Sequence, residues 1–157
     1  MPYLTLSTYK DLTIAPAVFV DEVQTAHPGW VDSQLVFWSG WIDSRLKKRY
    51  AAPFADPPNT PPVICGWLAR ILDEELYLKR GMDPEDKQSA KVEERAQAAK
   101  DQIQEAADSE KGLFELPLRA DQPGATDISR AAPLGYTEQS PYTWSGIQRE
   151  AELDGSG

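Results

Sequence analysis

The chain has 157 residues, 41% of them hydrophobic, and a formal net charge of −9 at pH 7. These values suit one domain with a modest core, or one domain with an appendage. The acidic balance argues against a protein that wraps nucleic acid, because phosphate binding needs a basic surface. It does not argue against an acidic surface past which DNA moves. No apolar run approaches the ~18 residues of a membrane-spanning helix, and the opening MPYLTLSTYK predicts no signal peptide.

Two short helices are predicted at the start of the chain. Ser7 or Thr8 can cap a helix of one turn. Pro16 suits the first position of a second helix, which reads PAVFVDEVQTA. His27 lies in the turn that follows and is the only histidine of the chain. We therefore expect it to be a surface residue.

The stretch from Trp30 to Arg80 organises the rest of the chain. It contains two amphipathic segments, joined by an elbow whose five prolines forbid a helix. We expect the two helices to fold back on each other as a hairpin, in which each large buried side chain contributes roughly 1.5–3 kcal/mol. The buried face of the first segment follows the 3.6-residue period and consists of Val31, Leu35, Trp38, Ile42 and Leu46.

Four positions in this stretch carry local predictions. Asp32 or Ser33 can cap the first helix. Gly40 lies inside it at a cost of about 1 kcal/mol relative to Ala, so we expect another backbone to pack closely there. Cys65 is the only cysteine. Because it lies within an apolar helix face, we interpret it as a buried thiol. Gly81 is a predicted C-cap.

A third long helix is predicted between Asp83 and Asp108. Its apolar positions form an alanine-rich heptad seam. This helix either lies against the hairpin with a solvated outer face or meets a neighbouring subunit. The residues of a possible subunit interface are Arg45, Lys48, Arg49, Val92, Ala96, Ala99 and Ile103.

The amino-acid composition changes after this helix. GLFELPL reads as a short extended segment that can dock in a groove or on a sheet edge. Recurrent prolines and glycines then predict an extended arm. We therefore expect a mainly α protein, with a helical bundle in residues 1–112 and an arm in residues 113–157. The residues predicted to bind a partner are Leu113, Phe114, Leu116, Leu118, Leu134, Tyr136, Tyr142, Trp144 and Ile147.

No stretch reads as a catalytic site. There is no glycine-rich phosphate loop after a strand and no Cys–His spacing of a metal site. The run Asp73-Glu74-Glu75 is interpreted as a solvated helix face. The basic run from Arg45 to Arg49 is interpreted as a helix-end charge set or half of a subunit interface. We expect no enzyme activity, no cofactor and no metal.

Residues 5–118 nevertheless carry an ordered pattern. Two short helices precede IDSRLKKRYAAPF, a proline-rich elbow, PPVICGWLARILDEELY and a long charged helix. The most recognisable positions are Ile42, Asp43, Leu46, Arg49, Tyr50 and Pro53, then Pro61, Pro62, Cys65, Ala69 and Leu72. In this pattern the chain resembles the head–tail connector (head completion, or adaptor) proteins of tailed bacteriophages.

The resemblance implies a structural virion protein. Such proteins form a ring, usually dodecameric, below the portal at the neck of the particle, after assembly in the host cytoplasm. The ring extends the DNA channel without reading sequence, and it meets the tail or a stopper protein, while C-terminal arms commonly reach into the portal. The alternative is a small helical regulatory or adaptor protein of another system, such as an antitoxin-like interaction module.

Overall fold

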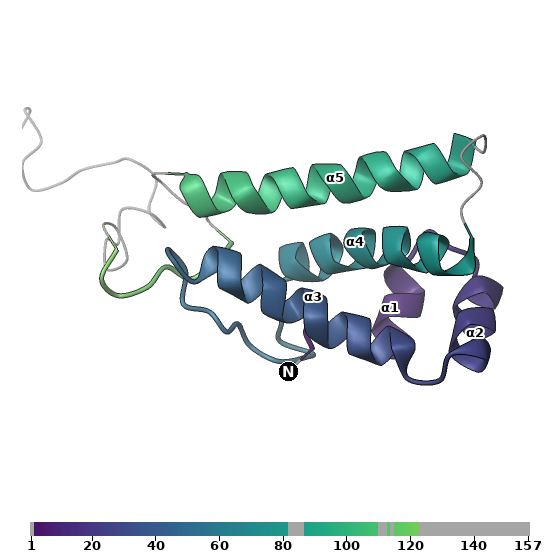
Figure 1. The fold of residues 1–157 in the computed structure, drawn as a ribbon. Helices are drawn as coiled ribbons and strands as arrows, with labels where there is room; N and C mark the ends of the chain where they lie inside the picture. Colours follow the sequence, from purple (N-terminus) through teal and green to yellow (C-terminus); the bar gives the residue numbers. More distant parts are fainter. Residues whose placement is uncertain (1, 82–86, 110–112, 114, 123–157) are drawn as a thin grey trace, which may run out of the picture. The chain divides into compact units, whose positions relative to one another are not determined.

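The structure is a computed structural model that describes residues 2–81, 87–109, 113 and 115–122. Residues 1–125 form one compact unit and residues 126–157 a second one, of which nothing is described. The prediction of a mainly helical protein is confirmed. The described helices, in chain order, are α1 (Leu6–Leu12), α2 (Ala17–Ala26), α3 (Trp30–Leu46), α4 (Pro62–Arg80) and α5 (Lys87–Asp108) (Figure 1).

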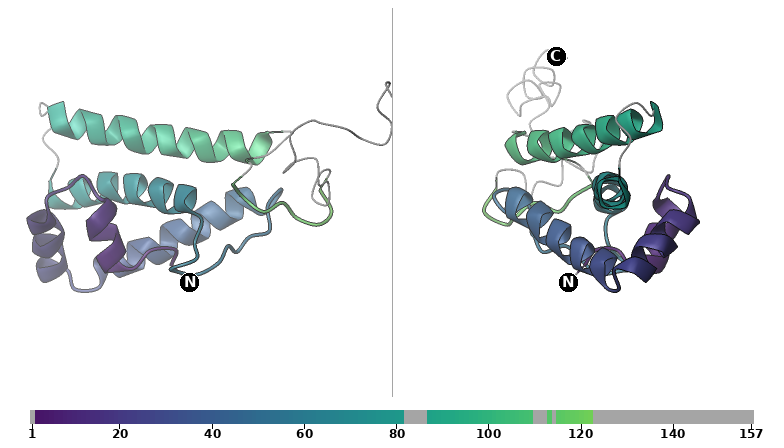
Figure 2. Two further views of the ribbon diagram at one scale, coloured as in Figure 1. Left: turned by 180° about the vertical axis from the view of Figure 1, so that it is seen from behind. Right: turned by 45° about the vertical axis from the view of Figure 1, so that its right-hand side comes forward.

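Helix α4 lies at the centre of the first unit. It packs against α1, α2, α3 and α5. In the right-hand view of Figure 2, α4 is seen nearly end-on, with α5 on one side and α3 on the other. Because α4 has neighbours on several sides, its buried residues are distributed around much of the helix. They are Ile64, Trp67, Leu68, Ala69, Ile71, Leu72, Asp73, Leu76 and Tyr77.

The most extensive helix contact joins α4 to α5, which run alongside each other (Figure 1). Helices α3 and α4 also contact each other, but less extensively, and the predicted helical hairpin stays a prediction. The predicted alanine-rich seam of α5 is buried within the single chain, where its small side chains let helices approach closely. The prediction of a subunit interface through α5 is therefore wrong for four residues, whose side chains are at most 1% exposed within the single chain: Val92, Ala96, Ala99 and Ile103.

Tyr50 joins the elbow to the end of α5. Its hydroxyl donates to the carbonyl of Ala106 at 3.0 Å and accepts from the backbone N–H of Leu113 at 2.7 Å. Within the described residues, the predicted β segment is reduced to an isolated antiparallel bridge between Tyr50 and Leu118. Leu116 is buried in the core beside this bridge. The described residues after 112 therefore pack against the helical body.

The first two helices begin close to their predicted positions. Thr5 is the N-cap of α1, and its hydroxyl oxygen accepts from the backbone N–H of Thr8 at 3.2 Å. The predicted caps, Ser7 and Thr8, lie inside the helix. Pro16 precedes α2 directly instead of occupying its first position.

Glycines mark the ends of the long helices. Gly29, with φ +77°, is the N-cap of α3, so the predicted caps Asp32 and Ser33 lie within its first turn. Gly81, with φ +104°, is the C-cap of α4, as predicted. The expected close backbone contact at Gly40 is wrong, because a Cβ built there has no neighbour within 4 Å. The predicted start of α5 at residues 83–86 lies outside the described residues.

Gly40→Ala should stabilise the protein. Residue 40 lies inside α3 with open space around it, so alanine adds helix propensity of about 1 kcal/mol without a clash. Urea unfolding followed by circular dichroism measures the gain. Gly29→Ala is the control, since its positive φ should make alanine destabilising there. A destabilised Gly40→Ala protein would contradict the open environment.

A buried carboxylate ties α4 to the first helix and the turn after it. Asp73 is 3% exposed, so its prediction as part of a solvated face is wrong. Its Oδ1 accepts from the hydroxyl of Tyr9 at 2.9 Å and from that of Thr13, and its Oδ2 accepts from the backbone N–H of Ile14 at 3.4 Å. Burial raises the pKa of Asp73 above its usual 3.8, although these hydrogen bonds oppose the shift.

The raised pKa of Asp73 leads to a prediction about how the stability of the protein depends on pH. The folded protein binds the Asp73 proton more tightly than the unfolded chain does. This group therefore contributes stability below pH 3.8, which is lost as the pH rises through the folded pKa. Asp73→Asn keeps an acceptor for Tyr9 and Thr13 but cannot ionise. The free energy of unfolding of the variant should therefore rise relative to that of the wild type as the pH increases above 3.8. Paired urea titrations measure this difference, and a change of opposite sign would show that the hydrogen bonds outweigh burial.

Candidate functional site

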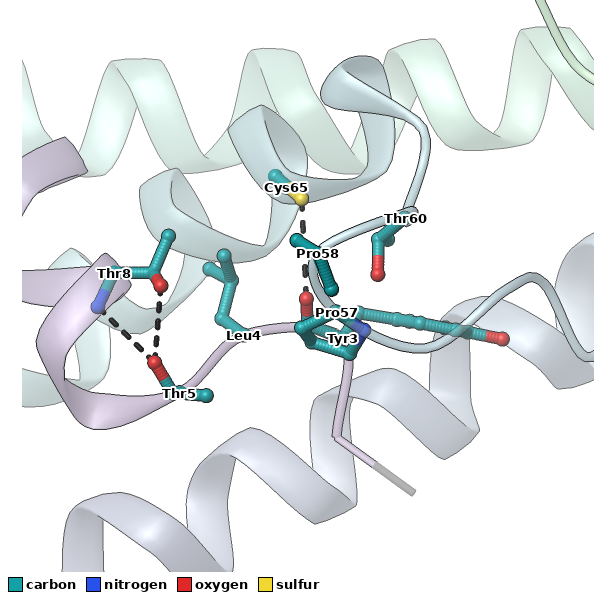
Figure 3. A pocket seen from close by; sticks show the side chains of 8 residues that line it. All are labelled: Tyr3, Leu4, Thr5, Thr8, Pro57, Pro58, Thr60 and Cys65. Carbon is teal, nitrogen blue, oxygen red and sulfur yellow. Dashed lines mark hydrogen bonds between the residues drawn. The ribbon is translucent and has the colours of Figure 1, made fainter.

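One described pocket lies where the N-terminal segment meets the elbow and α4. It has a volume of about 370 Å³. Figure 3 shows the side chains that line it, with the Cys65 thiol directed at the carbonyl of Tyr3 and the hydroxyls of Thr5 and Thr8 paired with each other. The lining residues are Tyr3, Leu4, Thr5, Thr8, Pro57, Pro58, Thr60 and Cys65.

The polar groups of this pocket serve the fold. The hydroxyl of Thr60 donates to the carbonyl of Ala55 at 2.8 Å. The hydroxyl of Tyr3 bonds Asp43 and accepts from a backbone N–H of the elbow. Burial raises the pKa of the Cys65 thiol, which disfavours the reactive thiolate. Cys65 is half-buried, so the predicted buried thiol is only partly enclosed. The pocket offers no activated nucleophile.

A second feature is an aromatic surface on α3. The rings of Phe37 and Trp38 meet edge to face at 5.3 Å between centroids, and Trp38 meets Trp41 in the same way at 5.5 Å. Phe37 remains 60% exposed, and the two tryptophans are partly exposed. We call these three residues the aromatic ridge. Such contacts hold the rings in fixed orientations, which is a property of binding surfaces.

Cations flank the aromatic ridge. The guanidinium of Arg45 lies 5.2 Å from the Trp41 ring centroid, and the Lys100 ammonium lies 5.5 Å from that of Trp38. Lys100 also forms an ion pair with Glu74 at 2.5 Å, which links α5 to α4. A partly buried ion pair therefore holds the cation beside the middle ring, Trp38, while Arg45 beside Trp41 is exposed. An exposed aromatic surface beside an exposed positive charge favours partners with rings and carboxylates.

The sequence-predicted partner residues divide into three groups. Leu116 is buried in the chain's own core, which leaves it no surface for a partner, so that prediction is corrected here. Leu113 and Leu118 pack partly buried against the same core. The remaining predicted residues lie outside the described residues: Phe114, Leu134, Tyr136, Tyr142, Trp144 and Ile147.

The basic residues at the end of α3 stay on the surface. Lys48 lies 3.9 Å from Asp108 in an exposed ion pair, which contributes at most about 1 kcal/mol. The carbonyl of Arg49 accepts from the backbone N–H of Arg119 at 3.0 Å. Together with Arg45, these residues remain open to the proposal of an interface. His27 is an exposed C-cap of α2, as its position in the turn predicted.

The ridge was only partly visible in the sequence. The 3.6-residue pattern predicts Trp38 on the buried face of the helix, with Phe37 and Trp41 widening that face. This prediction is wrong for Phe37, which is 60% exposed. The pattern Phe-Trp-x-x-Trp places three rings along one flank of a helix, because positions three and four apart are neighbours. That spacing was the available signal. It does not reveal which flank lacks a covering helix.

Comparison with known proteins finds no match among family models, curated proteins or solved structures. Among the described residues, no group of three or more His, Cys, Asp or Glu side chains is placed to hold a metal ion. In the same part of the chain, none of the helices combines the length and apolar character needed to cross a membrane. The candidate site is therefore the aromatic ridge, which is a surface for contact.

The buried edge of the ridge leads to a prediction about stability. The indole Nε1 of Trp38 is buried and has no acceptor among the described residues, whereas that of Trp67 donates to Gln102 at 2.9 Å. Trp38→Phe removes an unpaired donor, so part of its packing loss should be offset. Trp67→Phe removes a donor that has an acceptor, so it should lower the free energy of unfolding by about 1–2 kcal/mol more than Trp38→Phe does. Urea unfolding of both variants measures the difference, and equal losses would contradict it.

Proposed function

We propose that the chain is a structural virion protein, a head–tail adaptor of a tailed bacteriophage, without enzymatic activity. The observation that carries the proposal is the aromatic ridge, an exposed, oriented aromatic surface on a helical body whose pocket beside the N-terminal segment has its polar groups engaged in the fold. The connector resemblance supplies the kind of partner. Its recognisable positions Ile42, Leu46 and Tyr50 are fully buried in this body, so the pattern describes a fold and not a catalytic signature.

In this role, copies of the chain form a ring, usually dodecameric, below the portal. The ring extends the DNA channel and presents a docking surface to the tail or a stopper protein at the neck of the virion. The net charge of −9 supports such a channel, because an acidic wall repels phosphates and does not trap the genome. The partners are the portal, the tail or stopper protein, and further copies of the chain.

The C-terminal arm is the proposed link to these partners. It carries bulky residues at wide spacing, which suits a segment that orders on binding. Aromatic side chains commonly provide most of the binding energy at such contacts. The predicted arm residues are Leu134, Tyr136, Tyr142, Trp144 and Ile147.

Deletion of residues 123–157 tests the role of the arm. The deletion leaves intact the described hydrogen bonds of Arg119 and Gln122 to the end of α3. The full chain should co-sediment with the portal protein of the phage that encodes it, and the deletion should weaken binding by at least ~10-fold, which is about 1.4 kcal/mol.

Negative-stain images of the same mixture test whether the chain is a ring-forming adaptor. Rotational symmetry around a channel is expected for the full chain with the portal. Unchanged portal binding by the deletion variant would refute the role of the arm. A full chain that neither binds the portal nor forms a ring would refute the adaptor proposal and favour the regulatory alternative.

A further inference from the structure

The aromatic ridge is more exposed than folding requires. Phe37 is 60% exposed although it belongs to a packed set of rings. Exposed rings that adjoin one another mark contact sites on soluble proteins. We propose that the ridge binds the segment from Leu134 to Trp144 in the C-terminal arm of a second copy of this chain. This inference deepens the proposed function and rests on it for the ring.

The chemistry of the segment fits the ridge. It reads LGYTEQSPYTW, so three rings and one proline lie within eleven residues. Edge-to-face contacts between rings contribute about 0.5–1.5 kcal/mol each beyond the area that they bury. Aromatic surfaces are also the usual docking sites of extended proline-containing peptides. A partner with both features matches a surface made of Phe37, Trp38 and Trp41.

The charges of the arm and of the ridge also favour this contact. Residues 123–157 contain five acidic and two basic side chains, a net charge of −3. Arg45 stands beside Trp41, and the exposed Lys47 and Lys48 follow it at the end of α3. Glu138 lies inside the proposed segment. An acidic, aromatic segment is thus attracted to the basic end of the ridge, and added salt should weaken this attraction.

The position at which the arm leaves the body allows exchange between copies. Arg119 donates to the carbonyl of Lys47 at 3.2 Å, and Gln122 donates to that of Lys48 at 3.5 Å. The arm therefore begins beside the C-terminal end of α3. The twelve steps along the chain from Gln122 to Leu134 span at most roughly 40 Å when extended. This reach covers a neighbouring copy of similar size.

The proposed ring requires that the arm of one copy bind the ridge of a different copy. The ridge and the arm are two different surfaces, so their contact is heterologous, and a repeated heterologous contact closes into a ring when the rotation allows. A ring is what the proposed function requires. Docking of the arm on its own ridge, or on another protein, would leave each copy without this link and is an outcome that the test separates.

The test uses full-length chains and sedimentation velocity over a range of concentrations. Phe37→Ser removes the most exposed ring of the ridge, and Tyr142→Ser with Trp144→Ser removes two rings of the arm. Each change should weaken self-association of the chain by at least ~30-fold, as expected for a dominant interface side chain. Val18→Ser is the matched control, because Val18 is 61% exposed on α2, away from the ridge, and its self-association should be that of the wild type.

Mixing the two defective chains gives the decisive result. The ridge variant keeps a functional arm, and the arm variant keeps a functional ridge. Neither should associate alone, but their mixture should form a species of twice the monomer mass that grows no further. Arg45→Glu serves as a second ridge variant, and its effect should diminish with added salt. Far-UV circular dichroism of each variant verifies that its fold is retained.

Three outcomes would overturn the proposal: a wild type that is monomeric at all concentrations, as docking within one chain predicts; variants that associate like the wild type; or a mixture without the dimer. Portal co-sedimentation of the wild type and of the Phe37→Ser chain, whose arm is intact, reports separately on the adaptor role. Retained portal binding without the mixed dimer refutes the pairing alone. A mixed dimer without any portal binding refutes the adaptor role alone.

Discussion

The packing of α4 against four other helices is the constraint on which the rest of the structure depends. A helix with neighbours on several sides cannot leave its polar groups to water, so each of them needs a partner in the protein. Asp73 finds three donors in α1 and the turn after it. Trp67 donates to Gln102, and Glu74 pairs with Lys100, both on α5. These polar contacts fix how α1 and α5 are placed on α4.

The same packing decides which side of α3 stays open. Helix α3 contacts α4 and α5 through a narrow face that includes Val31, Ile42 and Leu46, all fully buried. Its aromatic flank continues beyond that face. Lys100 reaches the nearer ring, Trp38, while Phe37 at the far end has most of its surface in solvent. The body gains little from exposing a ring, which is why the aromatic ridge carries the proposed contact with another molecule.

The sequence predicted the periodic part of this fold and missed what depends on neighbours. The 3.6-residue period identified the core of α3, and glycine at position 81 identified the end of α4. Asp73 was misread because three consecutive carboxylates point in three directions, and only the position of α1 shows which of them is enclosed. Gly40 was misread because a small residue indicates that close approach is allowed and not that it occurs. The burial of Leu116 depends on a contact with the distant elbow, which no local pattern reveals.

The contacts of Tyr50 connect this body to the proposed assembly. Its hydroxyl holds the end of α5 and the segment at Leu113, while the backbone beside it pairs with residues 117 and 119. The chain is thereby led back to the basic end of α3 before residue 123. A closed symmetric ring requires that every copy present its surfaces in the same relative position. The aromatic ridge lies on α3, and the described chain up to Gln122 is hydrogen-bonded to Lys47 and Lys48 directly after that helix, so the proposed contact would start from the same end of α3 in every copy.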